Sequence, residues 1–225
     1  MRTLVIGDIH GCFTALRAMI ESIGLRADDK IITLGDYIDR GTESKQVISY
    51  LIKLKEMYNM VTLKGNHEAL LQAACHSRMD RLTWTNAGGL STLLSYEVNH
   101  PVNIPQDHWD FINQCELYHE TEDYIYVHGG LEPDVDLEDQ SEDEMLWIRF
   151  RDLQPHKSEK TIVCGHTPQR DHIVKDIGHA ICVDTHVFAK TGWLTCLEVE
   201  TGRFWQTNQQ LELRELHLDD FKVFE

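Results

Sequence analysis

The sequence lacks any apolar run long enough to cross a membrane. Its longest uncharged apolar runs, such as Thr3–Ile6 and residues 31–34, have the length of a strand, whereas a membrane-spanning helix needs roughly 20 apolar residues. The N-terminus also lacks the apolar region and the cleavage site of a secretory signal peptide, because Met1 and Arg2 lead directly into the first of these runs. We therefore expect no transmembrane segment and a cytoplasmic protein.

Positively charged residues are scarce. The chain has 21 Lys and Arg against 37 Asp and Glu, which gives a formal net charge of -16 at pH 7. Such a charge repels nucleic acid and anionic lipid, so we expect neither as a partner. A phosphate-containing ligand would need a local source of positive charge.

Cysteine pairs typical of disulfide frameworks or zinc sites are missing as well. Six cysteines are scattered with no C-x-x-C pair, and a chain of 225 residues can bury a core without disulfides. With 42% hydrophobic and 26% charged residues, the composition is that of an ordinary globular protein. We expect reduced thiols and a single domain over residues 1–225.

The first third of the chain alternates between strand and helix patterns. Apolar residues recur at helical spacing over Phe13–Ile23 and residues 44–58, and these helices separate short apolar strands at 4–6, 30–34 and 60–63. The order β-α-β-α-β predicts a parallel sheet that is covered by helices.

The rest of the chain divides into a helical segment and a strand-rich half. Residues 68–122 indicate a mostly helical insertion, whose aromatic residues, such as Trp84 and Tyr96, are expected to form a small core of their own. Residues 134–144 are so acidic that a solvated loop is expected, and the tail 211–225 receives no assignment. Further strands are predicted at 124–127, 161–164, 180–183, 193–199 and 203–206.

Five apolar strands end in a glycine next to a polar residue that can bind metal. These endings are Gly7-Asp8-Ile9-His10, Gly35-Asp36, Gly65-Asn66-His67, His128-Gly129-Gly130 and Gly165-His166. Each could by itself be a turn cap. Because ligands of open α/β sheets bind at the carboxyl ends of the strands, five such endings together favour one shared site.

The chemistry of these side chains points to metal ions. Carboxylates, imidazoles and an amide oxygen, without a thiolate, suit hard or borderline ions such as Mn²⁺, Fe or Zn²⁺. Six candidate ligands exceed what one catalytic ion needs, and a carboxylate such as Asp36 can bridge two ions roughly 3.5–4 Å apart. The sequence therefore predicts two divalent cations, which would also offset the acidic surface for a phosphate.

The five blocks, extended by Asp39-Arg40-Gly41 and Thr167-Pro168, stand in the order of the signature blocks of the PPP-type metallophosphoesterases. Over residues 1–202 the chain resembles the small bacterial or phage-type serine/threonine protein phosphatases of that family. The resemblance implies an α/β fold of four layers, in which two mixed sheets flanked by helices hold a dinuclear metal centre at the strand ends. It also implies hydrolysis of phosphomonoesters by a hydroxide that bridges two ions, with Mn²⁺ expected and Fe or Zn as alternatives.

The same resemblance gives a role to each residue of the blocks. It makes Asp8 and His10 ligands of one ion, Asp36 the bridge, and Asn66, His128 and His166 ligands of the other. His67 matches the general acid and Asp39 the carboxylate that orients it. Arg40 and Arg149 match the phosphate clamps, with Arg151 as an alternative to Arg149.

Two departures from the family pattern limit what the resemblance implies. Related bacterial enzymes usually have glycine after the Asp-Thr of a late strand, where this chain has His186 after Asp184-Thr185. His186 is therefore either a bystander or an extra group at the rim of the site, and we do not count it among the expected ligands. The chain also lacks the long C-terminal region of the eukaryotic enzymes, so no regulatory subunit is implied.

The expected partner is a phosphorylated protein or peptide, and two other functions are considered. One is a dinucleoside polyphosphate hydrolase of the same superfamily. That branch typically lacks the Asp of Asp39-Arg40 and has Gly-Asn-His-Asp where this chain has Gly-Asn-His-Glu68. The other is a catalytically silent phosphoprotein-binding module, which would have lost a ligand or His67. The blocks favour the protein phosphatase over both.

Overall fold

The computed structural model of the protein describes residues 2–221. The strands are β1 (Thr3–Ile6), β2 (Lys30–Thr33), β3 (Asn59–Thr62), β4 (Tyr118–Glu120), β5 (Tyr124–Val127), β6 (Thr161–Cys164), β7 (Lys175–Asp176), β8 (Ala180–Cys182), β9 (Leu194–Glu198), β10 (Arg203–Thr207) and β11 (Leu213–His217). The α-helices are α1 (Phe13–Ile23), α2 (Ser44–Met57), α3 (Asn66–Ala74), α4 (Arg78–Trp84), α5 (Leu90–Tyr96), α6 (Gln106–Asn113) and α7 (Glu142–Trp147). Among the described residues, no helix combines the length and the apolar character that a membrane span requires.

The first sheet has six strands in the order β11-β10-β9-β1-β2-β3. β1, β2 and β3 are parallel, with Val5 opposite Ile32 and Ile32 opposite Val61. Since α1 and α2 connect these strands, the predicted β-α-β-α-β unit is confirmed. β9 pairs with β1 in the antiparallel direction, which makes the sheet mixed.

The second sheet has five strands in the order β4-β5-β6-β8-β7. β5, β6 and β8 are parallel, whereas the outer strands β4 and β7 are antiparallel to their neighbours. The sequence did not predict β4, β7 or β11, because these edge strands are short or half-exposed and lack an apolar run. The acidic segment 134–144 is largely exposed, and its last residues begin α7.

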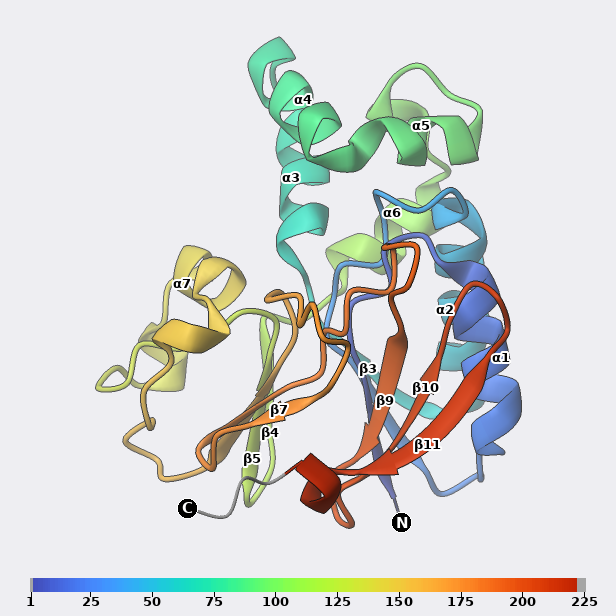
Figure 1. The fold of residues 1–225 in the computed structure, drawn as a ribbon. Coiled ribbons are helices and arrows are strands. Elements are labelled where there is room, and N and C mark those ends of the chain that lie inside the picture. Colours follow the sequence, from blue (N-terminus) through green and yellow to red (C-terminus); the bar gives the residue numbers. More distant parts are fainter. Residues whose placement is uncertain (1, 222–225) are drawn as a thin grey trace.

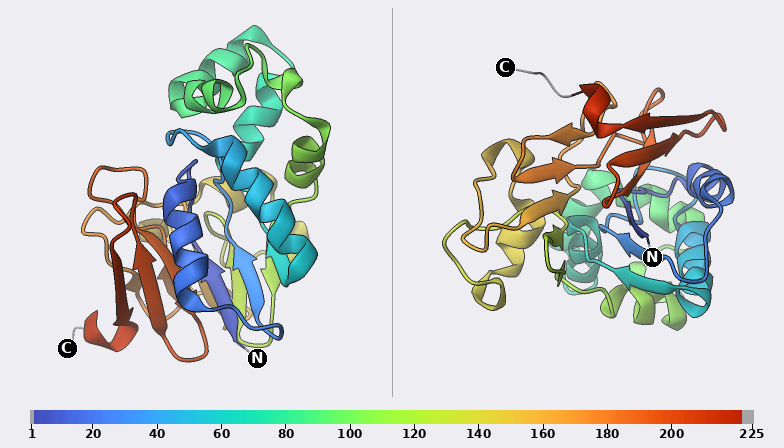
Figure 2. Two further views of the ribbon diagram at one scale, coloured as in Figure 1. Left: turned by 90° about the vertical axis from the view of Figure 1, so that its right-hand side faces the viewer. Right: turned by 90° about the horizontal axis from the view of Figure 1, so that it is seen from below.

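The hydrophobic core lies in three layers. Successive residues of a strand point to opposite faces of its sheet, so that they contribute to different layers. Leu4 and Ile6 of β1 face the layer under α1 and α2, whereas Val5 faces the second sheet. In β5, Tyr126 faces the first sheet and Ile125 faces the layer under α7. Two sheets thus pack face to face with helices outside both (Figure 1 and Figure 2). The predicted four-layer α/β fold is confirmed.

The helical segment α3–α5 stands above the ends of the sheets (Figure 1). α3 begins at Asn66, immediately after the loop that follows β3. α4 and α5 are joined by a π-helical turn, Thr85–Gly89, in which Gly88 has a φ of 121°. This break turns α5 back toward α2, so the segment covers the edge of the sheets at which the parallel strands end.

Candidate active site

The ends of parallel strands from both sheets bring the predicted site residues together. Asp8 and His10 follow β1, Asp36 follows β2, Asn66 and His67 open α3, His128 follows β5 and His166 follows β6. All seven side chains are buried. Their loops lie at one edge of the molecule, below the helical segment α3–α5 (Figure 1).

The loops that carry these residues adopt backbone conformations that favour glycine. His10 and Asp36 have φ values of 45° and 51°, which cost about 1–2 kcal/mol for a residue with a side chain. Neighbouring glycines make room for the carboxylates. A Cβ on Gly65 would lie 2.2 Å from Asp36 Oδ1, and one on Gly165 would lie 2.1 Å from an oxygen of Asp8. The strand-end glycines are therefore required by the carboxylates beside them.

Asp36 lies at the centre of the cluster. Its Oδ2 is 3.3 Å from His10 Nε2, and its Oδ1 is 3.5 Å from His128 Nε2. The backbone N–H of His67 donates a hydrogen bond to Oδ1 at 3.0 Å. The carboxylate thus faces an imidazole on each side, which is the position a bridging ligand would need.

Hydrogen bonds fix which nitrogen of His10 and His128 carries the proton. His10 Nδ1 donates to the carbonyl of Ile38 at 3.0 Å, and His128 Nδ1 donates to the carbonyl of Leu34 at 2.8 Å. Burial lowers the pKa of both imidazoles, so both are neutral. Each Nε2 therefore presents a lone pair toward Asp36.

The charge of Asp36 makes this arrangement fit divalent cations. Burial favours the neutral carboxyl, but the neighbouring histidines, among them His67 with its raised pKa, and the hydrogen bond from the backbone N–H of His67 lower the pKa of Asp36, so it is ionised. Two imidazole lone pairs that face a carboxylate repel it unless a cation lies between them. The backbone carbonyls behind the two rings are also partners of the kind that orient histidine ligands.

On one side of Asp36, three further ligand candidates converge. Asn66 Oδ1 is 2.9 Å from His128 Nε2 and 3.0 Å from His166 Nδ1. Burial lowers the pKa of His166 to about 3, so its ring is neutral. In the described part of the chain, His166 Nε2 is buried without a hydrogen-bond partner. These atoms are an oxygen and two imidazoles directed at one point, as a cation site requires.

Asp36 belongs to both groups of side chains that can hold an ion. One group consists of His10, Asp36 and His67, and the other of Asp8, Asp36 and His128, with ligand atoms in each group within 4.8 Å of one another. The structure therefore places Asp8 beside His128 as well as near the loop of His10. Which residue binds which of two ions stays a prediction.

His67 is oriented by a buried carboxylate that accepts three side-chain hydrogen bonds. Asp39 Oδ2 accepts from His67 Nδ1 at 2.7 Å and from Trp84 Nε1 at 2.8 Å, and Thr92 Oγ1 donates to Asp39 Oδ1 at 2.6 Å. A buried carboxylate needs such partners, because water cannot reach it. Trp84 ends α4 and Thr92 lies in α5, so the helical segment completes the surroundings of the Asp39–His67 pair.

The prediction that Trp84 belongs to a separate small core of the insertion is wrong. Its ring is fully buried in the main core that also contains residues of α1 and α2, and its N–H serves Asp39. One signal of this position is present in the sequence, the Gly88-Gly89 break. A Cβ on Gly89 would lie 2.3 Å from the Trp84 ring, so the indole can occupy this position only beside a glycine.

His67 can hold a proton and direct it toward a bound group. Burial disfavours the imidazolium, but Asp36 and the hydrogen bond with Asp39 outweigh burial and raise the pKa of His67. Its other nitrogen, Nε2, lies 3.1 Å from Arg40 Nη2. The Arg40 guanidinium in turn stacks on Phe188, 4.4 Å from the ring centre. The Nε2 end of His67 therefore faces an arginine at the mouth of the cluster.

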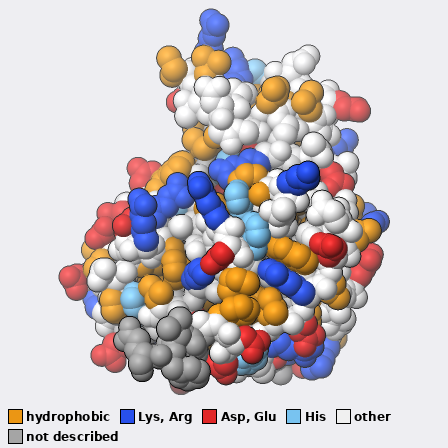
Figure 3. Space-filling model, in the orientation of Figure 1, with side chains coloured by type: hydrophobic (Ala, Val, Ile, Leu, Met, Phe, Trp, Pro, Cys, Tyr) orange, Lys and Arg blue, Asp and Glu red, His pale blue; other side chains and the backbone are white. Residues whose placement is uncertain are grey.

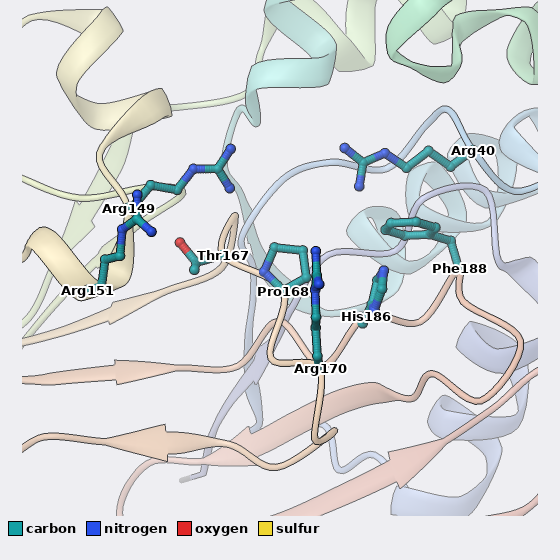
Figure 4. A pocket seen from close by; sticks show the side chains of 8 residues that line it. All are labelled: Arg40, Arg149, Arg151, Thr167, Pro168, Arg170, His186 and Phe188. Atoms are coloured by element: carbon teal, nitrogen blue, oxygen red, sulfur yellow. The ribbon is translucent and has the colours of Figure 1, made fainter.

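A positively charged pocket of about 510 Å³ adjoins the buried cluster. Its lining is Arg40, Arg149, Arg151, Thr167, Pro168, Arg170, His186 and Phe188 (Figure 4). The space-filling view shows Lys and Arg side chains around histidines in a hollow below the helical segment (Figure 3). This pocket supplies the local positive charge that a phosphate ligand of so acidic a chain requires.

The two arginines considered as phosphate clamps occupy different positions. Arg149 Nη1 donates to the backbone carbonyl of His166 at 3.1 Å, beside the buried cluster. The side chain of Arg151 is 82% exposed and lies 3.6 Å from its neighbour Asp152. In Figure 4, Arg149 and Arg40 reach toward each other from opposite walls. The geometry therefore favours Arg149 over Arg151 as the partner of Arg40.

Two residues after β8 complete the surroundings of the cluster. His186 lines the pocket and packs edge-on against Phe188, with 4.6 Å between ring centres, which agrees with a place at the rim. Sequence reasoning assigned no role to Asp184, yet it is buried with one oxygen lacking a hydrogen-bond partner in the described residues. Burial raises the pKa of Asp184 to about 6. The sequence carries no signal for Asp184, because it lies in a loop after β8 and has no glycine beside it.

Comparison with known proteins agrees with this site. The chain is 30% identical over 171 residues to the serine/threonine-protein phosphatase PP2A-like PPG1 of Saccharomyces cerevisiae, which covers 75% of this chain and 42% of that protein. It is 29% identical over 142 residues to a symmetrical bis(5'-nucleosyl)-tetraphosphatase of Nitrosomonas europaea, which covers 61% of this chain and 48% of that protein. The chain thus spans about half the length of the curated relatives it matches.

A solved structure shows the same fold. The cold-active protein-tyrosine phosphatase of a psychrophilic Shewanella species aligns with a TM-score of 0.66 and 16% identity, over 96% of this chain and 80% of that one. The sequence profile of the calcineurin-like phosphoesterase family matches residues 1–190, the part that contains every residue of the cluster and its pocket. This chain belongs to the calcineurin-like phosphoesterase family.

Proposed function

We propose that this protein is a metal-dependent phosphatase that removes phosphate from phosphoserine and phosphothreonine in proteins or peptides. The Asp39–His67 pair, with 2.7 Å between Oδ2 and Nδ1, carries this proposal. A serine or threonine alkoxide is a poor leaving group that needs a proton as the P–O bond breaks, whereas the phosphate released from a polyphosphate leaves as a stable anion. A buried imidazole whose pKa is raised by carboxylates supplies that proton.

The proposed site combines metal ligands with residues that bind the substrate. Two divalent ions, for which we propose Mn²⁺ with Fe or Zn as alternatives, would be held by Asp8, His10, Asp36, Asn66, His128 and His166. When bound, such ions lower the pKa of a coordinated water and offset the charge of the phosphate. Arg40 and Arg149 grip the phosphoryl oxygens from opposite sides. His67 donates its Nε2 proton to the departing alcohol, and Asp39 keeps the ring oriented through Nδ1.

Hydrolysis of dinucleoside polyphosphates is the second candidate function. It is favoured by the four arginines of the pocket, which could hold several phosphates. Against it stand Asp39 and Glu68, both of which belong to the blocks that resemble protein phosphatases. The Glu68 carboxylate accepts the backbone N–H groups of Asp36, Tyr37 and Gly65 at 2.8, 2.9 and 2.9 Å. A shorter aspartate in its place would not reach all three donors from the same backbone position.

Substrate preference separates the two candidates. Protein that has been stripped of metal and reloaded with Mn²⁺ is assayed for phosphate release from a phosphoserine or phosphothreonine peptide and from diadenosine tetraphosphate. We expect metal-dependent turnover of the peptide with little turnover of the dinucleotide. The reverse preference would assign the protein to nucleotide hydrolysis at the same site. No turnover of either would favour a silent binding module. The cytoplasmic location and the lack of nucleic-acid and membrane partners remain predictions.

Replacing Trp84 with phenylalanine should lower kcat without disturbing the metal site. The variant keeps a large ring in the core but removes the N–H that holds Asp39 Oδ2, so the Asp39–His67 pair loses part of its orientation. We expect kcat for a phosphoserine peptide to fall about tenfold, the effect of one charge-assisted hydrogen bond, and the pH profile of kcat to shift. Trp109→Phe, which removes an N–H bonded to the carbonyl of Pro101 instead, is the matched control. Equal kcat values and equal pH profiles of kcat for the Trp84→Phe and Trp109→Phe variants would contradict a positioning role for Trp84.

A further inference from the structure

The pocket beside the cluster holds more positive charge than a single phosphate needs. Four of its eight lining residues are arginines, and none is acidic. In the proposed reaction, Arg40 and Arg149 already match the two negative charges of a phosphomonoester. Arg151 and Arg170 remain in the same pocket without a role in that reaction.

The side chain of Arg170 is positioned to bind a ligand in the pocket. It follows the turn of Thr167 and Pro168, and its side chain points toward the gap between Arg40 and Arg149 (Figure 4). Within residues 2–221 it has neither a hydrogen bond nor an ion pair. Even its acidic neighbour Asp171 pairs with Lys175 instead.

The guanidinium of Arg170 is unpaired although the chain has a net charge of -16. Within the described residues, Arg2, Arg17 and Arg203 each lie near a carboxylate on another part of the surface. Among the residues that the structure describes, Arg151 has one ion pair, the exposed contact with Asp152 at 3.6 Å, and exposed pairs of this kind contribute little stability. Both arginines are therefore free to bind an anionic group that enters the pocket.

We propose that Arg170, assisted by Arg151, binds a second negatively charged group of the substrate beside the phosphate that is removed. The inference rests on the proposed phosphatase function and narrows its substrate to a phosphoserine or phosphothreonine with an acidic neighbour. That neighbour is a carboxylate or a further phosphate, which guanidinium groups bind alike. Arg40 and Arg149 hold the reacting phosphate, and Arg170 sets the preference among peptides.

Two phosphothreonine peptides of equal length test this inference. One carries glutamate on both sides of the phosphothreonine and the other carries glutamine, so that the peptides differ in charge and hardly in shape. With the Mn²⁺-loaded wild-type protein, we expect kcat/KM for the glutamate peptide to exceed that for the glutamine peptide by about fivefold. In Arg170→Gln the ratio should fall close to one. A version of each peptide with a non-hydrolysable phosphonate should show the same change in the ratio of Kd values.

Arg17→Gln on α1 is the control, since Arg17 is a surface arginine that lies near Glu21 and outside the pocket. This variant should keep the wild-type ratio. If wild-type protein turns over both peptides equally, the second anion site is refuted while the phosphatase function stands. A preference that survives in Arg170→Gln would remove Arg170 from the proposal. If neither peptide is turned over and the dinucleotide is, the phosphatase function itself fails and the narrower inference fails with it.

Discussion

Replacing His67 with asparagine is expected to lower kcat for a phosphoserine peptide by about 10²–10⁴-fold, the range for the loss of a positioned general acid. Asparagine is polar and of similar size, but it cannot give up a proton to the serine alkoxide. His67 is not among the predicted ligands, so metal content should stay at the wild-type level. Steady-state kinetics and elemental analysis of the purified variant measure the two effects separately.

The leaving group provides an internal control for this result. An aryl phosphate that releases an acidic phenol needs little help from a general acid. We therefore expect kcat of His67→Asn toward such an ester to fall far less than kcat toward the peptide. Equal losses on both substrates would show that His67 acts on the site as a whole. A kcat for the peptide that stays within about threefold of wild type would remove the acid assignment.

Replacing Asp36 with asparagine should abolish both metal binding and activity. Asp36 lies between His10 and His128, 3.3 and 3.5 Å from their Nε2 atoms, and its charge is what draws cations between these neutral rings. The neutral amide offers one oxygen and no charge. We expect metal affinity to fall by more than the roughly 10–100-fold that loss of an outer partner costs. Activity at limiting Mn²⁺ should fall below about 1% of wild type for the same reason.

Asp110→Asn, an exposed change on α6 that removes one carboxylate charge outside the site, is the control. It should bind metal as wild type does. Circular dichroism of Asp36→Asn then separates loss of metal from loss of fold, and Asp36 is not one of the hydrophobic residues that form the described core clusters. Two full equivalents of metal in Asp36→Asn would contradict the bridging assignment.

Much of the site could be predicted because its residues follow the apolar strands that the sequence marks. An apolar run, a glycine and a metal-binding side chain are adjacent in the chain at Asp8, Asp36 and His128. Parallel strands end at the same edge of a sheet, so local pattern alone brings these residues together. The helices α1 and α2 were predicted for the same reason, since their apolar spacing is a local property.

Edge strands and the helical segment were harder to predict from the sequence. β11 lies in the tail that received no assignment, and its alternate exposed residues give no apolar run. Trp84 looked like an ordinary core residue, because a hydrogen bond from an indole to a carboxylate leaves no pattern in the chain. Such contacts depend on where two segments meet in space.

By itself, the sequence determined the fold class, the strands that carry the ligands and the chemical nature of the site, because each depends on residues that are neighbours in the chain. The tertiary structure alone decided which groups surround Asp39. Trp84 and Thr92 are 45 and 53 residues away from it along the chain. It also decided that Arg40, Arg149, Arg151 and Arg170 line one pocket. Spacing in the sequence cannot reveal such contacts, since the packing of distant segments brings these side chains together.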